Sequence, residues 1–185
     1  MVDLVGLTKK QIRSRILLSL KTQKEEDRDR KSKLIKRKLF RMRFFKKAKI
    51  VMFYVSFNGE VKTQDMIKEA LKLGKIIAVP VCLKRCIIKP SLLRIKDRLV
   101  KGIYGAPEPA IKRFINLNKL DLVIVPGVAF DKRGRRLGRG KGFYDRFLSK
   151  LSHKTTSVGL AFNLQILPLV PTTKRDVSVD RVIFA

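Results

Sequence analysis

The sequence predicts an α/β fold, a single three-layer α/β/α domain around a mostly parallel sheet with basic N-terminal helices. Continuous apolar runs such as Ile50–Val55 and Leu122–Val125 are typical of strands that are buried on both faces. Segments with helical periodicity separate these runs, and alternating strands and helices favour a parallel sheet. The length of 185 residues agrees with one domain over residues 1–185.

The first fifty residues predict two basic helices. Thr8 and Gln11 have the spacing of a capping box, so we expect a helix to begin near Lys9. A charged break at residues 24–27 separates it from a second helical run. The positions expected on the inner faces recur at helical intervals and are Ile12, Ile16, Leu20, Ile35, Leu39 and Met42.

Beyond residue 50 the pattern predicts strands and helices in turn. We expect a strand over residues 50–55, a turn at Asn58-Gly59, a helix over residues 63–73 and a strand over residues 76–79 that Pro80 stops. The later elements are expected as short strands within residues 86–95, a buried strand over 122–125, a helix from about 143 to 151, and strands over 158–162 and 179–184.

The composition is strongly basic, with 44 Lys and Arg against 15 Asp and Glu and a formal net charge of +29. Such charge suggests an anionic partner, such as nucleic acid, a nucleotide or an anionic membrane surface. Residues 1–50 carry 18 basic and 5 acidic side chains, but the excess continues along the rest of the chain. A solvated basic surface is therefore favoured, and a nucleic-acid-binding module remains the competing class.

Other features narrow the function further. No window approaches the ~18 uncharged apolar residues of a membrane span, and the start lacks a secretory pattern, so we expect a cytoplasmic protein. We also expect a monomer. Cys82, Cys86 and the single His153 are too few for a four-ligand zinc site. A catalytic triad that depends on histidine is equally disfavoured, and inert thiols are the favoured interpretation.

The segment Asp121–Leu148 carries the clearest chemical pattern. A buried strand leads into a loop with glycines at alternate positions and then into a helix, so backbone N–H groups could approach a phosphate. Neither the Rossmann nor the P-loop spacing is present, and a flexible basic loop remains the alternative. Asp145, in the first turn of that helix, could hold Mg²⁺ against bound phosphates or could stabilise the helix dipole.

The string VPGVAFDKRGRRLGRGKGFYDRFL, residues 125–148, resembles the signature of the 5-formyltetrahydrofolate cyclo-ligase family, whose members are also called 5,10-methenyltetrahydrofolate synthetases. Three further landmarks of that family occur in order, at residues 9–13, 54–60 and 102–109. The resemblance extends over almost the whole chain and implies a three-layer α/β/α fold. One departure is Lys62, where the family usually has Asp, and another is Arg175, where a His is common.

The resemblance implies an ATP- and Mg²⁺-dependent cyclisation of 5-formyltetrahydrofolate to 5,10-methenyltetrahydrofolate, with release of ADP and phosphate, through a phosphorylated formyl oxygen. No side chain has a covalent or acid–base role in this scheme, and both substrates are small molecules, with no specific nucleic acid and no membrane. A family member that has lost activity remains an alternative. The implied ATP-binding residues are Lys9, Arg13, Arg136, Leu137, Gly138, Arg139, Gly140, Lys141, Gly142, Phe143 and Tyr144. The implied folate-binding residues are Val55, Glu60 and Glu108, and Asp145 is the candidate ligand of Mg²⁺.

Overall fold

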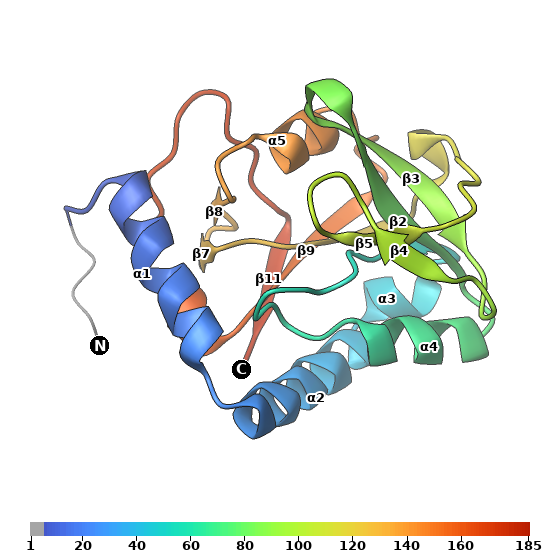
Figure 1. Cartoon of the computed structure of the whole chain (residues 1–185), viewed down its shortest axis with the longest axis horizontal. Helices are drawn as coiled ribbons and strands as arrows, with labels where there is room; N and C mark the ends of the chain where they lie inside the picture. Colours follow the sequence, from blue (N-terminus) through green and yellow to red (C-terminus); the bar gives the residue numbers. More distant parts are fainter. Residues whose placement is uncertain (1–5) are drawn as a thin grey trace.

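The computed structural model describes residues 6–185 and has a six-stranded sheet at its centre, with helices on both sides (Figure 1). The strand order is β11-β9-β6-β1-β2-β3. Neighbouring strands are parallel except for β3, which is antiparallel to β2. The mostly parallel sheet expected from the sequence is therefore confirmed. The strands are β1 (Ile50–Met52), β2 (Ile76–Leu83), β3 (Ile87–Leu93), β6 (Leu122–Val125), β9 (Thr156–Ala161) and β11 (Arg181–Phe184).

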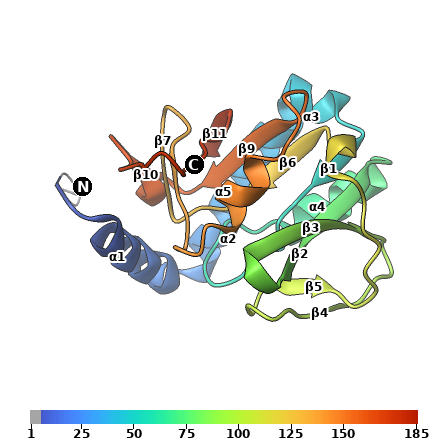
Figure 2. The same ribbon diagram turned by 90° about the horizontal axis from the view of Figure 1, so that it is seen from above.

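The helices form the two outer layers of the fold. Alternate residues of the central strands face opposite sides of the sheet, so Val51 joins one apolar cluster and Met52 the other. The first cluster contains side chains from α1 (Lys9–Thr22), α2 (Glu25–Arg41), α3 (Arg43–Lys47) and α4 (Gln64–Lys72). The second contains side chains of α5 (Phe143–Leu148), which Figure 2 shows on the opposite side of the sheet from α2 and α3.

Two small sheets carry the loops beside the carboxyl ends of the central strands. One has the order β10-β7-β8, with β7 (Ala129–Asp131) and β8 (Arg136–Leu137) forming an antiparallel pair and β10 (Ile166–Leu167) parallel to β7. The other pairs β4 (Leu99–Lys101) with β5 (Pro107–Pro109). Short 3₁₀ helices η1 (Lys84–Cys86), η2 (Leu117–Lys119) and η3 (Asn163–Gln165) complete the chain.

The N-terminal helices have the inner faces that the sequence predicts, but one boundary between them differs from the prediction. The capping box at Thr8 and Gln11 is confirmed, and five of the six expected inner-face residues are buried. The sixth, Met42, caps the end of α2 and is 38% exposed. The expected break at residues 24–27 was misplaced: Gln23 and Lys24 separate α1 from α2, whereas Glu25, Glu26 and Asp27 form the first turn of α2. Acidic side chains at this position are stabilised by the positive end of the helix dipole.

Three expected strand and helix ends were also wrong. β2 continues through Pro80, which lies opposite Pro90 in the antiparallel ladder with β3. β1 pairs with β2 only as far as Ala78, so the missing N–H of Pro80 removes no bond from the parallel ladder. β1 itself ends at Met52, although residues 53–55 stay buried, and α5 ends at Leu148.

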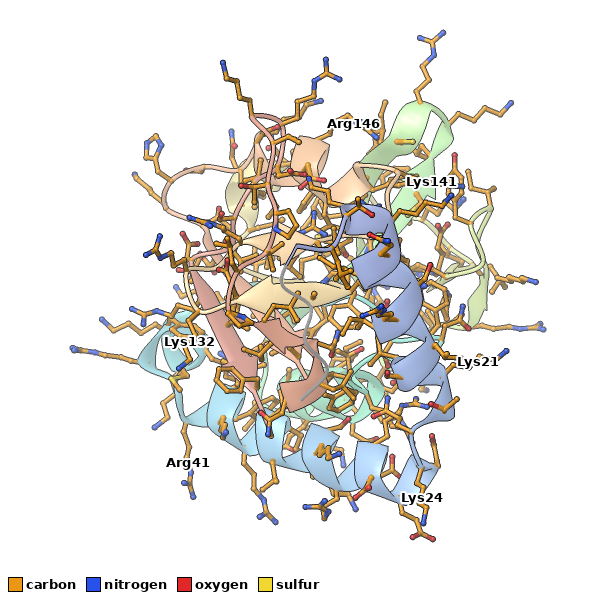
Figure 3. All side chains as sticks on the ribbon, turned by 90° about the vertical axis from the view of Figure 1, so that its left-hand side faces the viewer. Lys21, Lys24, Arg41, Lys132, Lys141 and Arg146 are labelled. Atoms are coloured by element: carbon orange, nitrogen blue, oxygen red, sulfur yellow. The ribbon has the colours of Figure 1, made fainter. Side chains whose placement is uncertain are left out.

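The basic side chains are spread over the outer surface. Figure 3 shows Lys21, Lys24, Arg41 and Lys132 extending away from the ribbon, and they belong to several separate elements. This spread agrees with the solvated basic surface favoured by the sequence. Within residues 6–185, no helix has both the length and the apolar character needed to cross a membrane.

Candidate active site

A cavity of about 220 Å³ lies just beyond the ends of β1 and β6 and against the second half of β2. In open parallel sheets, ligands bind beyond the carboxyl ends of the strands, so this is the expected place for a site. The glycine-rich loop after β8 and the first turn of α5 cover it from one side, and the loop before β5 contributes Tyr104 and Ala106, followed by Pro107 at the start of β5. Two aromatic rings of this wall pack against each other: Tyr104 and Phe143 are edge to face, with their centroids 4.9 Å apart.

Most of the residues singled out in the sequence come together around this cavity. Those that line it are Val55, Glu60, Arg136, Gly138, Arg139, Lys141, Gly142, Phe143, Tyr144 and Asp145. Residues more than 70 positions apart, such as Glu60 and Arg139, therefore share one site. The cavity also has lining residues that were not singled out, among them Tyr54, Phe57 and Cys82.

The other five candidates lie outside the lining. Arg13 is bonded to the loop, since its Nε donates to the Gly138 carbonyl at 2.8 Å, and Gly140 lies next to the same guanidinium. Lys9 forms an ion pair with Asp176. Leu137 is buried in the apolar core. Glu108 is also buried, and its Oε1 accepts a hydrogen bond of 2.8 Å from the Cys82 backbone N–H, so its carboxylate is held on the protein side of the cavity wall.

Glu60 owes its position to the Asn58-Gly59 turn. Gly59 has φ +81°, and a Cβ at this residue would lie 2.5 Å from the Leu20 carbonyl oxygen, so only glycine lets the turn pack against the end of α1. The Glu60 Oε2 accepts from the Phe57 N–H at 3.2 Å, and its Oε1 accepts from Arg139 Nη2 at 3.0 Å. Burial raises the pKa of the Glu60 carboxyl, while the Arg139 guanidinium opposes that rise.

Arg136 and Asp145 form the most enclosed ion pair of the site. Arg136 Nη2 donates to Asp145 Oδ1 at 2.8 Å, and the Arg136 side chain is only 3% exposed. The guanidinium carbon lies 5.6 Å from the Tyr144 ring centroid. Within residues 6–185, Arg136 Nε and the Tyr144 hydroxyl are buried without a hydrogen-bond partner. Both residues line the cavity, so these two unpaired donors belong to its wall.

Burial raises the pKa values of two other groups at the cavity. The pKa of the Tyr144 hydroxyl lies well above its usual range, with the charges of Cys82 and Glu60 acting in the same direction. Burial, and then the charge of Glu108, raise the pKa of the Cys82 thiol to about 11. Both groups therefore stay protonated at neutral pH, which makes Tyr144 a hydrogen-bond donor and Cys82 a poor nucleophile.

The structure brings a further acidic residue to this region that was not among the candidates. Asp176 pairs with Lys9, and the next residue, Val177, donates its N–H to Asp145 Oδ1 at 3.3 Å. The C-terminal loop thus joins the start of α1 to the glycine-rich segment. The only signal in the sequence was the Arg175-Asp176 pair, which occupies the place of the family's His-Asp.

Lys62, the main departure from the family pattern, points away from the cavity. Its Nζ forms ion pairs with Asp29 and, at 2.5 Å, with Glu25, both in the first half of α2. Its backbone N–H bonds to the Ser32 side chain at 3.1 Å. The lysine is thus matched by acidic residues of the neighbouring helix, outside the residues that line the site.

Comparison with known proteins agrees with the geometry. The sequence profile of the 5-formyltetrahydrofolate cyclo-ligase family matches residues 5–185. A probable 5-formyltetrahydrofolate cyclo-ligase of Caenorhabditis elegans is 33% identical over 86% of this chain and 84% of its own length. The 5-formyltetrahydrofolate cyclo-ligase of Mus musculus is 30% identical over 97% of this chain and 95% of its own length. The solution structure of Aquifex aeolicus 5,10-methenyltetrahydrofolate synthetase superposes with a TM-score of 0.85 at 32% identity, over 96% of this chain and 90% of that one. The chain therefore belongs to the 5-formyltetrahydrofolate cyclo-ligase family.

Proposed function

We propose that this protein uses ATP and Mg²⁺ to cyclise 5-formyltetrahydrofolate to 5,10-methenyltetrahydrofolate, with release of ADP and phosphate. One observation carries the proposal: a single cavity has the buried carboxylate of Glu60 at one part of its wall and the basic glycine-rich loop at another. A reaction between a folate and a nucleotide needs such a shared space, because the γ-phosphoryl group must reach the formyl oxygen directly.

Glu60 is suited to hold the pterin ring. Adjacent N–H groups on the pterin edge can donate to a carboxylate, and a charged acceptor makes such hydrogen bonds stronger. Tyr104 and Phe143 supply aromatic surface near the glycine-rich loop. Val55 adds an apolar contact beside Glu60 in the cavity lining.

The glycine-rich loop is suited to hold the ATP phosphates. Gly140 has φ +105°, a conformation that side-chain-bearing residues rarely adopt, and it lets the backbone turn beside Arg13. Arg13, Arg139 and Lys141 bring positive charge to this loop, with Lys141 Nζ lying 4.5 Å from the Tyr104 ring centroid. Backbone N–H groups and cationic side chains together favour an anion here.

The donor set also fits Mg²⁺, an ion that proteins usually hold through one or two carboxylates together with substrate phosphates. Asp145 lines the cavity, and its Oδ1 is occupied by Arg136 and by the Val177 N–H. Its Oδ2 would thus be the oxygen that holds the ion. No cluster of three or more His, Cys, Asp or Glu side chains suited to a metal occurs within residues 6–185, so the ion would depend on nucleotide for its other ligands. When bound, Mg²⁺ would neutralise phosphate charge.

The chemistry follows from the poor reactivity of an amide. The formyl oxygen of 5-formyltetrahydrofolate attacks the γ-phosphorus, ADP leaves, and the oxygen becomes part of a phosphate ester. Folate N10 then attacks the activated carbon, the ring closes, phosphate departs, and N10 loses its proton. The protein contributes positioning and charge stabilisation, and the free Arg136 Nε and the Tyr144 hydroxyl can donate to the oxygens that gain charge.

The proposal is tested by mixing the pure protein with ATP, Mg²⁺ and 5-formyltetrahydrofolate and following the near-ultraviolet absorbance of methenyltetrahydrofolate. We expect a signal that requires ATP and is abolished by chelation of Mg²⁺, with one ADP formed for each product molecule. A family member that is active under the same conditions serves as the positive control. No ATP-dependent signal would refute the proposed activity.

Lys62→Ala is expected to leave folate binding unchanged, because Lys62 faces α2 and not the cavity. The loss should appear in stability, as a decrease of about 0.5–1 kcal/mol in the free energy of unfolding, typical of exposed ion pairs. Steady-state kinetics and urea unfolding at low and high salt measure the two effects. A tenfold increase in the folate KM would show that Lys62 contacts the substrate after all.

A further inference from the structure

We infer that Arg139 couples the two halves of the site, so that nucleotide binding draws its guanidinium away from Glu60 and releases the carboxylate for folate. The inference rests on the proposed function, because it assigns phosphates to the glycine-rich loop and the pterin to Glu60. It adds a mechanism for communication between the two substrates, with Arg139 as the residue that carries it.

The geometry places Arg139 at the folate end of the cavity, although its backbone belongs to the phosphate loop. Arg139 Nη2 lies 3.0 Å from Glu60 Oε1, and the guanidinium carbon lies 4.9 Å from the Phe57 ring centroid. All three residues line the cavity. The guanidinium is therefore held by an ion pair and by an aromatic ring, in the place where a pterin donating to Glu60 would need room.

The two side chains of the ion pair differ in exposure, and this difference allows the pair to open from the Arg139 side. The Arg139 side chain is 39% exposed, whereas the Glu60 side chain is 8% exposed. Gly138 and Gly140 flank Arg139, so the backbone on both sides has unusual conformational freedom. Arg139 can thus leave at modest cost, while Glu60 stays fixed by the Phe57 N–H.

The neighbouring arginines cannot take this role. Arg136 is 3% exposed and is held by Asp145, and the Arg135 Nε lies 3.9 Å from the buried Asp131 carboxylate. Arg139 is thus the arginine of the loop whose guanidinium contacts the folate end. A triphosphate carries several negative charges and outcompetes a single carboxylate for an exposed guanidinium.

This mechanism predicts positive coupling between nucleotide binding and folate binding. Without nucleotide, folate must displace Arg139 from Glu60, which weakens its binding. With nucleotide, the phosphates hold the guanidinium and folate meets a free carboxylate. Binding linkage then requires that folate strengthens nucleotide binding by the same factor.

The test is calorimetry of 5-formyltetrahydrofolate binding with and without a saturating, non-hydrolysable ATP analogue and Mg²⁺. For the wild-type protein we expect the analogue to tighten folate binding by about 5- to 150-fold, the usual range of coupling between sites. Arg139→Met keeps a side chain that can cover Phe57 but has no N–H groups, so the analogue should change its folate affinity by less than about twofold. Without nucleotide, this variant should bind folate more tightly than the wild type.

A matched control is Arg135→Met, which removes the same charge from the turn between β7 and β8, just before the glycine-rich loop, and should keep the coupling. The measurements are made at about pH 8, well above the ordinary pKa of a glutamate, because burial raises the pKa of Glu60. Wild-type folate affinity that does not respond to the analogue would overturn the inference. The inference would also be overturned if Arg139→Met bound folate more weakly than the wild type in the absence of nucleotide. This comparison does not depend on whether the variant binds nucleotide. A wild-type protein that binds neither ligand would instead refute the proposed function.

Discussion

Arg136→Met is expected to lower cyclisation activity by roughly 10²- to 10³-fold, the usual effect of removing a donor that stabilises developing charge. The variant should also lose about 3 kcal/mol of stability, at the lower end for a buried ion pair because the Asp145 side chain is 18% exposed. Without Arg136, the bond of 3.3 Å from the Val177 N–H is the one side-chain hydrogen bond that Asp145 keeps within the described residues 6–185. The variant also loses the Arg136 Nε, a buried donor that otherwise has no protein partner within residues 6–185.

One further variant separates charge from geometry at this position, and a second is a control at the neighbouring arginine. Arg136→Lys keeps the charge but not the planar fork, so we expect partial recovery of stability and little recovery of activity. Arg135→Met should leave kcat close to that of the wild type, because Arg135 is not among the residues that line the cavity. Urea unfolding and single-turnover kinetics give the two readouts. Unchanged single-turnover rates in Arg136→Met would exclude a role for this guanidinium in the chemical step.

The central strands could be predicted from the sequence because their signal is local. A strand that is buried on both faces must be apolar along its whole length, and the run Leu122–Val125 coincides with β6. The helix over residues 63–73 was predicted almost as well, since Thr63 caps α4 and Leu73 ends it. Such elements need no knowledge of their neighbours.

The errors arose where a neighbour decides the outcome. Proline normally stops a strand, but Pro80 lies beyond the end of β1 and opposite Pro90, where it interrupts no parallel-ladder bond. The acidic run at Glu25 resembles a break between helices, but acidic side chains are stabilised in the first turn of a helix by the helix dipole. In both cases the local sequence preference is real, but the position of the residue in the strand or helix decides the outcome.

Candidate residues for the site could be named from the sequence, but the contacts between them could not be predicted. The resemblance named the glycine-rich loop and Glu60, and the structure places both at one cavity. The Lys9–Asp176 ion pair joins residues 167 positions apart, and the Arg139–Glu60 pair joins residues 79 apart. Spacing within a single sequence carries no information about contacts of this length, so Asp176 was missed and the ion pair at Glu60 was not anticipated.

Glu60→Gln is expected to raise the KM for 5-formyltetrahydrofolate by about a hundredfold, because each hydrogen bond to a buried charged group contributes about 1.5–3 kcal/mol. Glutamine keeps the shape of the side chain, but it has one acceptor oxygen, and its NH₂ group would oppose the N–H groups of the pterin. Nucleotide affinity should not fall, because Arg139, once freed from Glu60 Oε1, remains available to the phosphates.

The matched control is Glu108→Gln, which alters the other buried glutamate next to the cavity. Glutamine can still accept the hydrogen bond from the Cys82 N–H, and Glu108 does not line the cavity, so the folate KM should change by less than about threefold. Initial rates at saturating ATP and calorimetry with the ATP analogue measure the two variants side by side. If Glu108→Gln raised the folate KM and Glu60→Gln did not, Glu108 would be the folate acceptor. If Glu60→Gln weakened nucleotide binding instead, Glu60 would belong to the phosphate end of the cavity, because loss of its ion pair with Arg139 should free Arg139 for the phosphates and should not weaken ATP binding.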